Sequence, residues 1–149
     1  MSTNRDELIN KFYSSFQKLD YNGMNSCYAD DIVFFDFVFG LLNGNEARSM
    51  WEMLCKNAKD FSLTYGNIQH LDDEYSTCDW VATYTFSKNG KRVVNKIKAN
   101  MRFADGKIAE HSDAFSLHKW SSQALGFSGW LLGWNSFFQH KIKNGAKKN

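Results

Sequence analysis

The sequence predicts an α+β domain in which N-terminal helices cover one face of a strongly bent antiparallel sheet. Apolar residues recur at helical spacing through the first third of the chain. Long β-rich stretches then follow one another with no helical crossover, and turn dipeptides such as Asn89-Gly90 and Asp105-Gly106 separate them. Helices grouped before antiparallel strands are typical of the α+β class.

Three helices are predicted in the N-terminal part. The first carries an apolar stripe at spacings of three and four residues, formed by Leu8, Ile9, Phe12, Phe16 and Leu19. Thr3 and Asn4, each followed three residues later by an acid, mark its start. Asp20 or Asn22 can cap a short second helix, and Asn45 can cap a third.

Strands are predicted in the rest of the body. The stretch from Ile32 to Phe39 is rich in β-branched and aromatic residues, which predicts a strand buried on both faces. Four further strands are predicted over residues 61–71, 75–87, 93–103 and 107–117. Their Asn-Gly and Asp-Gly turns need positive φ at the central residues, so we expect tight antiparallel hairpins.

Composition narrows the classes of function. Basic and acidic residues number 18 and 16, and four of the lysines lie in the last nine residues. The body therefore has no broad basic face, and nucleic acid is not an expected partner. Three widely spaced cysteines without a Cys-x-x-Cys pair predict buried free thiols in a reducing compartment, and the polar N-terminus does not look like a secretory signal. We expect a cytoplasmic protein.

The order of these elements and several short strings resemble the SnoaL-like, ketosteroid-isomerase-like branch of the nuclear transport factor 2 superfamily. The strings are Tyr28-Ala29-Asp30-Asp31-Ile32, Phe35-Asp36, the stretch from Arg102 to Ile108, and Glu110-His111-Ser112-Asp113. The resemblance covers about residues 8–117. It implies a cone-shaped sheet that encloses a pocket and is open at one end, and a homodimer formed through the outer face of the sheet. The same cone serves enzymes and non-catalytic binding modules, so it does not decide function.

Asp36 is the first candidate for chemistry, because it is a single carboxylate in an aromatic strand. Burial among rings raises the pKa of a carboxyl group, which suits a general base near neutral pH. The resemblance implies the same role, since the matching aspartate of ketosteroid isomerases moves the proton. The alternative is that Asp36 accepts hydrogen bonds from backbone N–H groups or faces solvent.

His111 and Asp113 are the second candidate. They share one face of the last strand with Ala109 and Phe115, so they project into a partly apolar surface. In SnoaL-like cyclases the aspartate at the position of Asp113 is the acid/base residue, and the residue two places earlier lines the pocket. The alternative is a His–Asp pair that orients a hairpin or a dimer contact.

Aromatic residues make up 16% of the chain, which indicates an apolar pocket wall. The wall residues that we predict are Phe12, Phe16, Phe34, Trp51, Met101, Phe115 and Trp134. The histidines lack the spacing of metal ligands, and no phosphate loop or dinucleotide fingerprint is present, so we expect neither metal nor cofactor. The positions that hold the oxyanion in ketosteroid isomerases correspond here to Phe12 and Ala99, and the Arg-x-Asp of limonene epoxide hydrolases is missing.

The C-terminal stretch, residues 118–149, is predicted to be an aromatic helical extension of a single domain, 1–149, whose core covers about residues 5–117. Its apolar residues at helical spacing are Trp130, Leu131, Trp134, Phe137, Phe138 and Ile142. Such a face must be covered, either as a lid over the mouth of the pocket or on a membrane surface that the terminal lysines would contact. Gly126, Gly129 and Gly133 favour the closely packed path of a lid.

These features predict a protein that holds a small, largely apolar, carbonyl-bearing molecule. Proton transfer by Asp113, His111 and Asp36 could isomerise or cyclise it. A non-catalytic ligand-binding or dimerisation module stays open as the alternative, so the sequence does not decide whether the protein is an enzyme. We also expect a homodimer with a wet interface, because the strand from Lys96 to Arg102 has one polar face.

Overall fold

The computed structural model of the protein describes residues 2–86, 89–116 and 119. Within these residues the chain forms the helices α1 (Ser2–Gln17), α2 (Tyr21–Asn25) and α3 (Asn45–Asn57). The predicted C-terminal helix, with Trp134 and the lid that we expect it to form, lies outside the described residues. Asp20 caps α2 as predicted, because its carboxylate accepts a hydrogen bond from the Gly23 N–H at 3.0 Å. Asn45 does not cap α3, because Gly44 takes the cap position with a φ of 52° and no side chain caps the helix.

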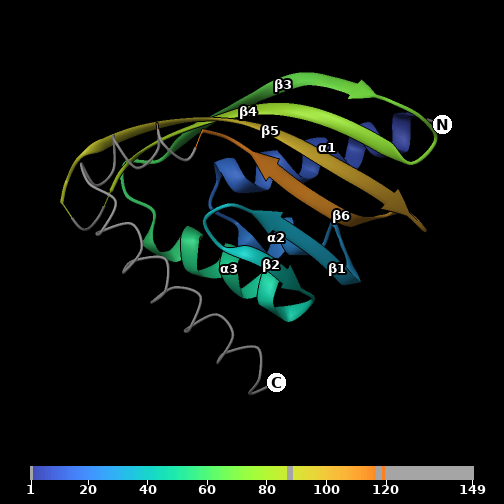
Figure 1. Ribbon diagram of the computed structural model, residues 1–149, viewed down its shortest axis with the longest axis horizontal. Helices are drawn as coiled ribbons and strands as arrows, with labels where there is room; N and C mark the ends of the chain where they lie inside the picture. The colour runs from blue at the N-terminus through green and yellow to red at the C-terminus, as the bar shows by residue number, and fades with distance from the viewer. Residues whose placement is uncertain (1, 87–88, 117–118, 120–149) are drawn as a thin grey trace.

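Six strands form one curved, unclosed sheet (Figure 1). In chain order they are β1 (Tyr28–Asp36), β2 (Gly40–Asn43), β3 (Ser62–His70), β4 (Tyr75–Thr85), β5 (Arg92–Ala104) and β6 (Lys107–Ala114). Their order in the sheet is β2-β1-β6-β5-β4-β3. The four later strands and their antiparallel hairpins are confirmed, and Asp105 and Gly106 have the positive φ values that their turn requires, 52° and 75°.

The prediction of a purely antiparallel sheet is wrong at one place, because β1 and β6 pair in parallel. Phe34 pairs with His111 and Phe35 with Ser112. The same register continued by one residue brings Asp36 level with Asp113. The sheet is therefore mixed, and the pairing brings two residues that are far apart in sequence to the same end of two adjacent strands.

The strand β1 is not buried on both faces, contrary to the prediction. Phe34 and Asp36 face inward and are buried, whereas Phe35 is 38% exposed on the other side. The short strand β2, which the sequence analysis did not predict, has the same alternation: Leu42 is buried and Leu41 is exposed. This edge of the sheet has one covered face and one open face, unlike a strand between two layers.

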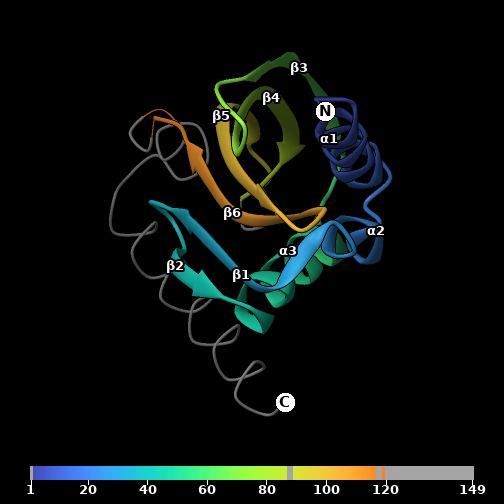
Figure 2. The same ribbon diagram turned by 90° about the vertical axis from the view of Figure 1, so that its right-hand side faces the viewer.

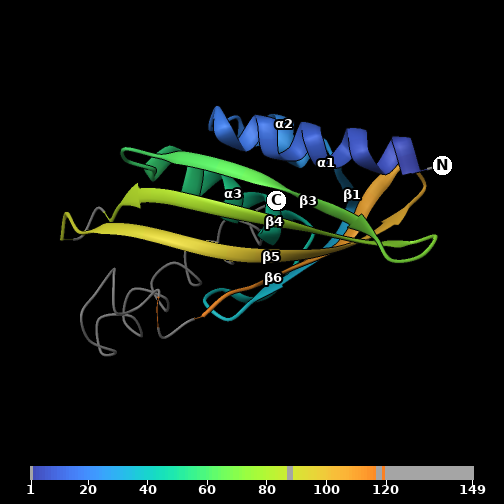
Figure 3. The ribbon, with the colours of Figure 1, turned by 90° about the horizontal axis from the view of Figure 1, so that it is seen from above.

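The helices lie on the concave side of the sheet, as predicted (Figure 2). α1 runs along β3, and the long strands β3, β4 and β5 run side by side beneath it (Figure 3). The N-terminal end of α1 is tied to the sheet through His70, whose ring nitrogens lie 2.8 Å from Asp6 Oδ1 and 2.7 Å from Ser76 Oγ. The functional site lies between the concave face of the curved sheet and the two longer helices, α1 and α3.

Cys27, Cys55 and Cys78 are buried free thiols, as predicted. In the part of the chain that the structure describes, no helix has the length and apolar character to cross a membrane.

Candidate functional site

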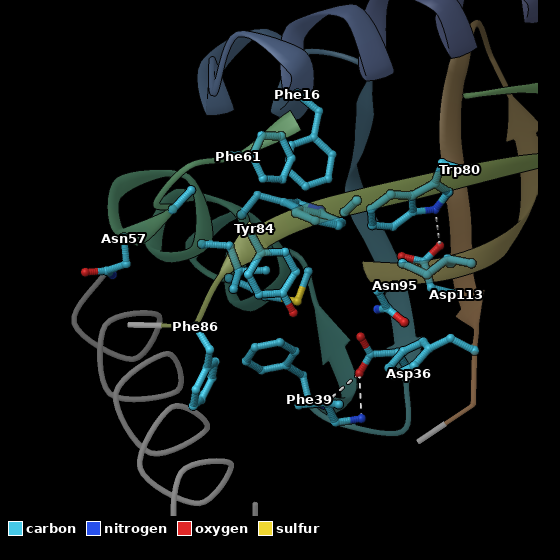
Figure 4. Close-up of a pocket in the computed structure, with 18 of the residues that line it drawn as sticks. Phe16, Asp36, Phe39, Asn57, Phe61, Trp80, Tyr84, Phe86, Asn95 and Asp113 are labelled. Atoms are coloured by element: carbon cyan, nitrogen blue, oxygen red, sulfur yellow. Dashed lines mark hydrogen bonds between the residues drawn. The ribbon is translucent and has the colours of Figure 1, made fainter. Parts of the chain in front are cut away.

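A cavity of about 150 Å³ lies between α1, α3 and the concave face of the sheet (Figure 4). Its walls are mainly apolar and rich in aromatic side chains: Phe16 comes from α1, Trp51 from α3 and Trp80 from β4. Polar side chains gather on the wall formed by the sheet, where Asp36 and Asp113 both face the cavity. A mainly apolar concavity with a few polar groups is the usual form of a small-molecule site.

Asp113 is held in place by two N–H donors. Its Oδ1 accepts a hydrogen bond from His111 Nε2 at 2.8 Å and a longer one from Trp80 Nε1 at 3.4 Å. Only 4% of the residue is exposed. Because both donors meet Oδ1, Asp113 Oδ2 is the oxygen that remains open to a ligand.

A chain of hydrogen bonds behind Asp113 fixes the direction of each proton. Trp51 Nε1 can only donate, and it donates to the Tyr28 hydroxyl at 2.9 Å. The Tyr28 hydroxyl lies 2.7 Å from His111 Nδ1. In the tautomer of His111 that donates from Nε2 to Asp113, Nδ1 is an acceptor, so the Tyr28 hydroxyl donates its own proton to that nitrogen. His111 is then the tautomer with its proton on Nε2, which is the proton that Asp113 accepts.

Aromatic rings enclose the His111 ring. Phe12 and Phe34 meet it edge-on with centroid distances of 5.5 and 5.1 Å, and Trp51 stacks on it at 6.2 Å. Only 1% of His111 is exposed. The imidazole therefore cannot rotate, and it orients Asp113 from behind the cavity wall.

Asp36 combines burial with hydrogen bonds from the backbone. Its Oδ1 accepts from the N–H groups of Val38 at 2.9 Å and Phe39 at 2.7 Å. Asp72 accepts from the N–H groups two and three residues on in the same way, at the surface, and these bonds lower its pKa. Burial outweighs the same two bonds at Asp36 and, together with the charge of Asp113, raises its pKa from 3.8 to about 7.

The family of the chain follows from its sequence. The family model described as the SnoaL-like domain matches residues 9–111. The chain belongs to the SnoaL-like family. The match runs from Ile9 in α1 to His111 in β6 and includes Asp36, so it covers the C-terminal part of α1, all of α3 and most of the sheet around the cavity.

Solved structures share this SnoaL-like fold at low sequence identity. One is a protein of ketosteroid isomerase-like fold from Catenulispora acidiphila in complex with trimethylamine, at 16% identity over 79% of this chain and 92% of that chain, with a TM-score of 0.69. Another is a candidate polyketide cyclase from Xanthomonas campestris, at 17% identity over 82% and 97%, with a TM-score of 0.68. A third is an LEH-like epoxide hydrolase from M. tuberculosis, at 16% identity over 87% and 96%, with a TM-score of 0.69. None of the curated proteins matches the chain.

The predicted wall residues of the SnoaL-like chain fall into two groups. Phe16, Trp51 and Phe115 line the cavity. The others that the structure describes are buried but lie behind the wall: Phe12, Phe34 and Met101. The physical reason is the position of His111, since two of these residues pack on its ring and the third is its partner in register on β5.

Among the site residues that sequence reasoning missed, three bear on its polar contacts. Trp80 and Asn95 line the cavity, and Tyr28 belongs to the hydrogen-bond chain. Asn95 could have been found, because it is a polar residue on the apolar face of β5, between Val93 and Ile97. Tyr28 and Trp80 give no local signal, since a buried aromatic residue at strand spacing is ordinary. Among the described residues, no group of three or more His, Cys, Asp or Glu side chains could hold a metal ion.

Asp36→Asn should remove a pH dependence of stability. The substitution keeps an acceptor oxygen for Val38 and Phe39 but cannot ionise. Because the folded pKa lies above the unfolded one, the stabilising contribution of neutral Asp36 is complete below about pH 4 and is lost as pH rises through about 7. The free energy of unfolding of the wild type, measured in urea relative to the variant, should fall by about 4 kcal/mol from pH 3.5 to 8.

Asp72→Asn is the matched control for this experiment, because Asp72 has the same hydrogen bonds without the burial. Its pKa is lowered, so the wild type should gain stability relative to this variant as pH rises. Parallel curves for the wild type and Asp36→Asn would show that Asp36 is solvated in the folded protein.

Tyr28→Phe should break the hydrogen-bond chain without changing the ring. Trp51 Nε1 and His111 Nδ1 would both lose a buried partner, so the free energy of unfolding should fall by about 2 kcal/mol. The indole N–H resonance of Trp51 should move upfield, since the proton loses its acceptor. Tyr65→Phe is the control, because that hydroxyl contacts Asn10 near the surface, and it should change stability by less than about 1 kcal/mol. An unmoved Trp51 resonance in Tyr28→Phe would contradict the chain.

Proposed function

We propose that the protein binds a compact, largely apolar, carbonyl-bearing molecule in the cavity and catalyses proton transfer on it, as an isomerase or a cyclase. One observation carries the proposal: two buried carboxylates, Asp36 and Asp113, share one wall of an apolar cavity. Two like charges in such a site favour different protonation states, which is how acid and base roles separate. The volume of about 150 Å³ suits a ligand about the size of a single ring.

The environments of the two carboxylates assign the roles. Asp113 is the general acid/base, since its Oδ1 is fixed by N–H donors and Oδ2 remains to take the proton from carbon. Asp36, with a pKa of about 7, holds a proton in part of the population at neutral pH and can donate it to the carbonyl oxygen. His111 positions Asp113, and Phe16, Trp51 and Phe115 provide the apolar contacts to the ligand. Such chemistry needs no cofactor.

The similarity in fold to the candidate polyketide cyclase favours cyclisation as the reaction of this protein, and the similarity to the protein of ketosteroid isomerase-like fold favours isomerisation. A non-catalytic binding module would use the same cavity without turnover. The cytoplasmic location stays a prediction from cysteine usage.

Turnover should be screened on compact enones, polyketide esters and epoxides, with keto-steroids as larger comparison substrates. Asp113→Asn keeps the acceptor for His111 and Trp80 but removes the base, so kcat should fall by about 10²- to 10⁴-fold. Asp79→Asn is the control, because Asp79 lies on the opposite face of β4 and pairs with Lys98; it should leave kcat unchanged. Turnover that survives in Asp113→Asn would place the chemistry elsewhere. If the wild type turns over no substrate, the binding module becomes the better account.

We also propose a homodimer through the outer face of the sheet, centred on an apolar patch and not on the polar face of Lys96 to Arg102 that the sequence suggested. The patch consists of Phe35, Phe37 and Leu41, which are 38, 61 and 58% exposed. Phe35 and Phe37 meet edge-on at 5.5 Å, and Phe35 pairs with Leu41 across β1 and β2. A contiguous exposed apolar patch is typical of an interaction surface.

Light scattering at micromolar concentration should report a dimer for the wild type and a monomer for Phe35→Ser/Phe37→Ser, because the double variant removes both rings from the patch. Leu71→Ser changes an equally exposed apolar residue beside the β3–β4 turn and should leave the dimer intact. A monomeric wild type would contradict the proposal.

A further inference from the structure

We propose that Asn95 anchors the carbonyl oxygen of the ligand, so that the cavity selects ketones and esters over hydrocarbons of the same shape. The inference rests on the proposed cavity but not on its proton-transfer chemistry.

Asn95 is a polar residue on an apolar wall. It lies in β5 opposite Ala82 of β4, and its neighbours on the inner face, Val93 and Ile97, are both buried. Its side chain is half-buried and faces the cavity near Asp36 and Asp113 (Figure 4). The amide therefore lies beside the two groups that would act on the ligand.

The Asn95 amide has no hydrogen bond to any residue that the structure describes. Other donors on the wall are already engaged: Trp51 Nε1 donates to Tyr28, and Trp80 Nε1 donates to Asp113. Two further donors on the wall are engaged as well: Asn57 bonds to the Met53 carbonyl, and Thr85 bonds to Asp60. The Asn95 amide is thus an N–H donor that remains available to the ligand beside Asp36 and Asp113.

A carbonyl oxygen fits this donor best. An amide N–H that faces an apolar cavity without a partner is unfavourable, and a ligand acceptor removes that penalty. A cationic or donor-rich group would instead be drawn to the carboxylates alone and would leave the Asn95 N–H unpaired. A hydrocarbon would leave both the amide and the carboxylates without partners. The amide next to Asp36 therefore points to a ligand whose oxygen lies between Asn95 and Asp36, with its neighbouring carbon toward Asp113.

The test measures binding rather than turnover. Cyclohex-2-enone and cyclohexene are the probes, because they share a ring size and differ in the carbonyl group. Titration of ¹⁵N-labelled protein, followed at the Trp80 indole N–H that lines the cavity, gives a Kd for each. The resonance is assigned with Trp80→Phe.

We expect the wild type to bind the enone more tightly than cyclohexene. Asn95→Leu should weaken enone binding about tenfold and leave cyclohexene binding equal or tighter, because it exchanges an amide for an apolar group of similar size. Asn100→Leu makes the same change on the opposite face of β5 and should alter neither Kd. Retained Trp80 and backbone resonances in each variant show that it is folded.

Three results would overturn the inference. The first is an Asn95→Leu variant that binds the enone as tightly as the wild type. The second is a wild type that binds both probes equally well. The third is a Trp80 resonance that neither probe shifts. The last result would also remove the cavity from the proposed function. An enone preference that depends on Asn95, found in a protein with no turnover, would instead retain the anchor and reject the proposed chemistry.

Discussion

The parallel pairing of β1 and β6 is the constraint on which the site depends. It sets Asp36 level with Asp113 on the inner face of neighbouring strands. Such strands lie about 4.8 Å apart, so each carboxylate is within the electrostatic field of the other. The helices α1 and α3 cover that end of the sheet, and the aromatic residues that they carry keep the surroundings apolar. The raised pKa of Asp36 follows from both facts, with burial as the larger cause.

A buried imidazole and a buried carboxylate are stable in this core because the hydrogen bonds that join them to Tyr28 and Trp51 all run in one direction, from donor to acceptor. Trp51 can only donate, and Asp113 Oδ1 is the acceptor at the other end, so the two ends of the chain determine which way the Tyr28 and His111 protons point. A partly satisfied network would be worse than an apolar core. The Tyr13 hydroxyl shows the contrast, since it is buried without a partner among the described residues, and burial raises its pKa and keeps it neutral.

Local signals predicted the parts of the fold that local physics decides. The cap at Asp20 and the hairpin turn at Asp105-Gly106 were found because short polar side chains and positive φ act within a few residues. The parallel neighbour of β1 was not found, because it lies about 75 residues along the chain and no turn joins the two strands. The strand β2 was missed because its four residues are too short for a period of two to stand out.

The site was predictable in its residue types but not in its electrostatics. The sequence offered burial and backbone hydrogen bonds as alternatives for Asp36, and the structure has both. Asp72 has the same bonds to the same relative positions, yet its pKa moves in the opposite direction. Nothing in the spacing of either residue distinguishes them. What distinguishes them is whether helices from elsewhere in the chain exclude water, so the chemistry of a carboxylate in this fold is decided by the packing of distant elements and not by its own motif.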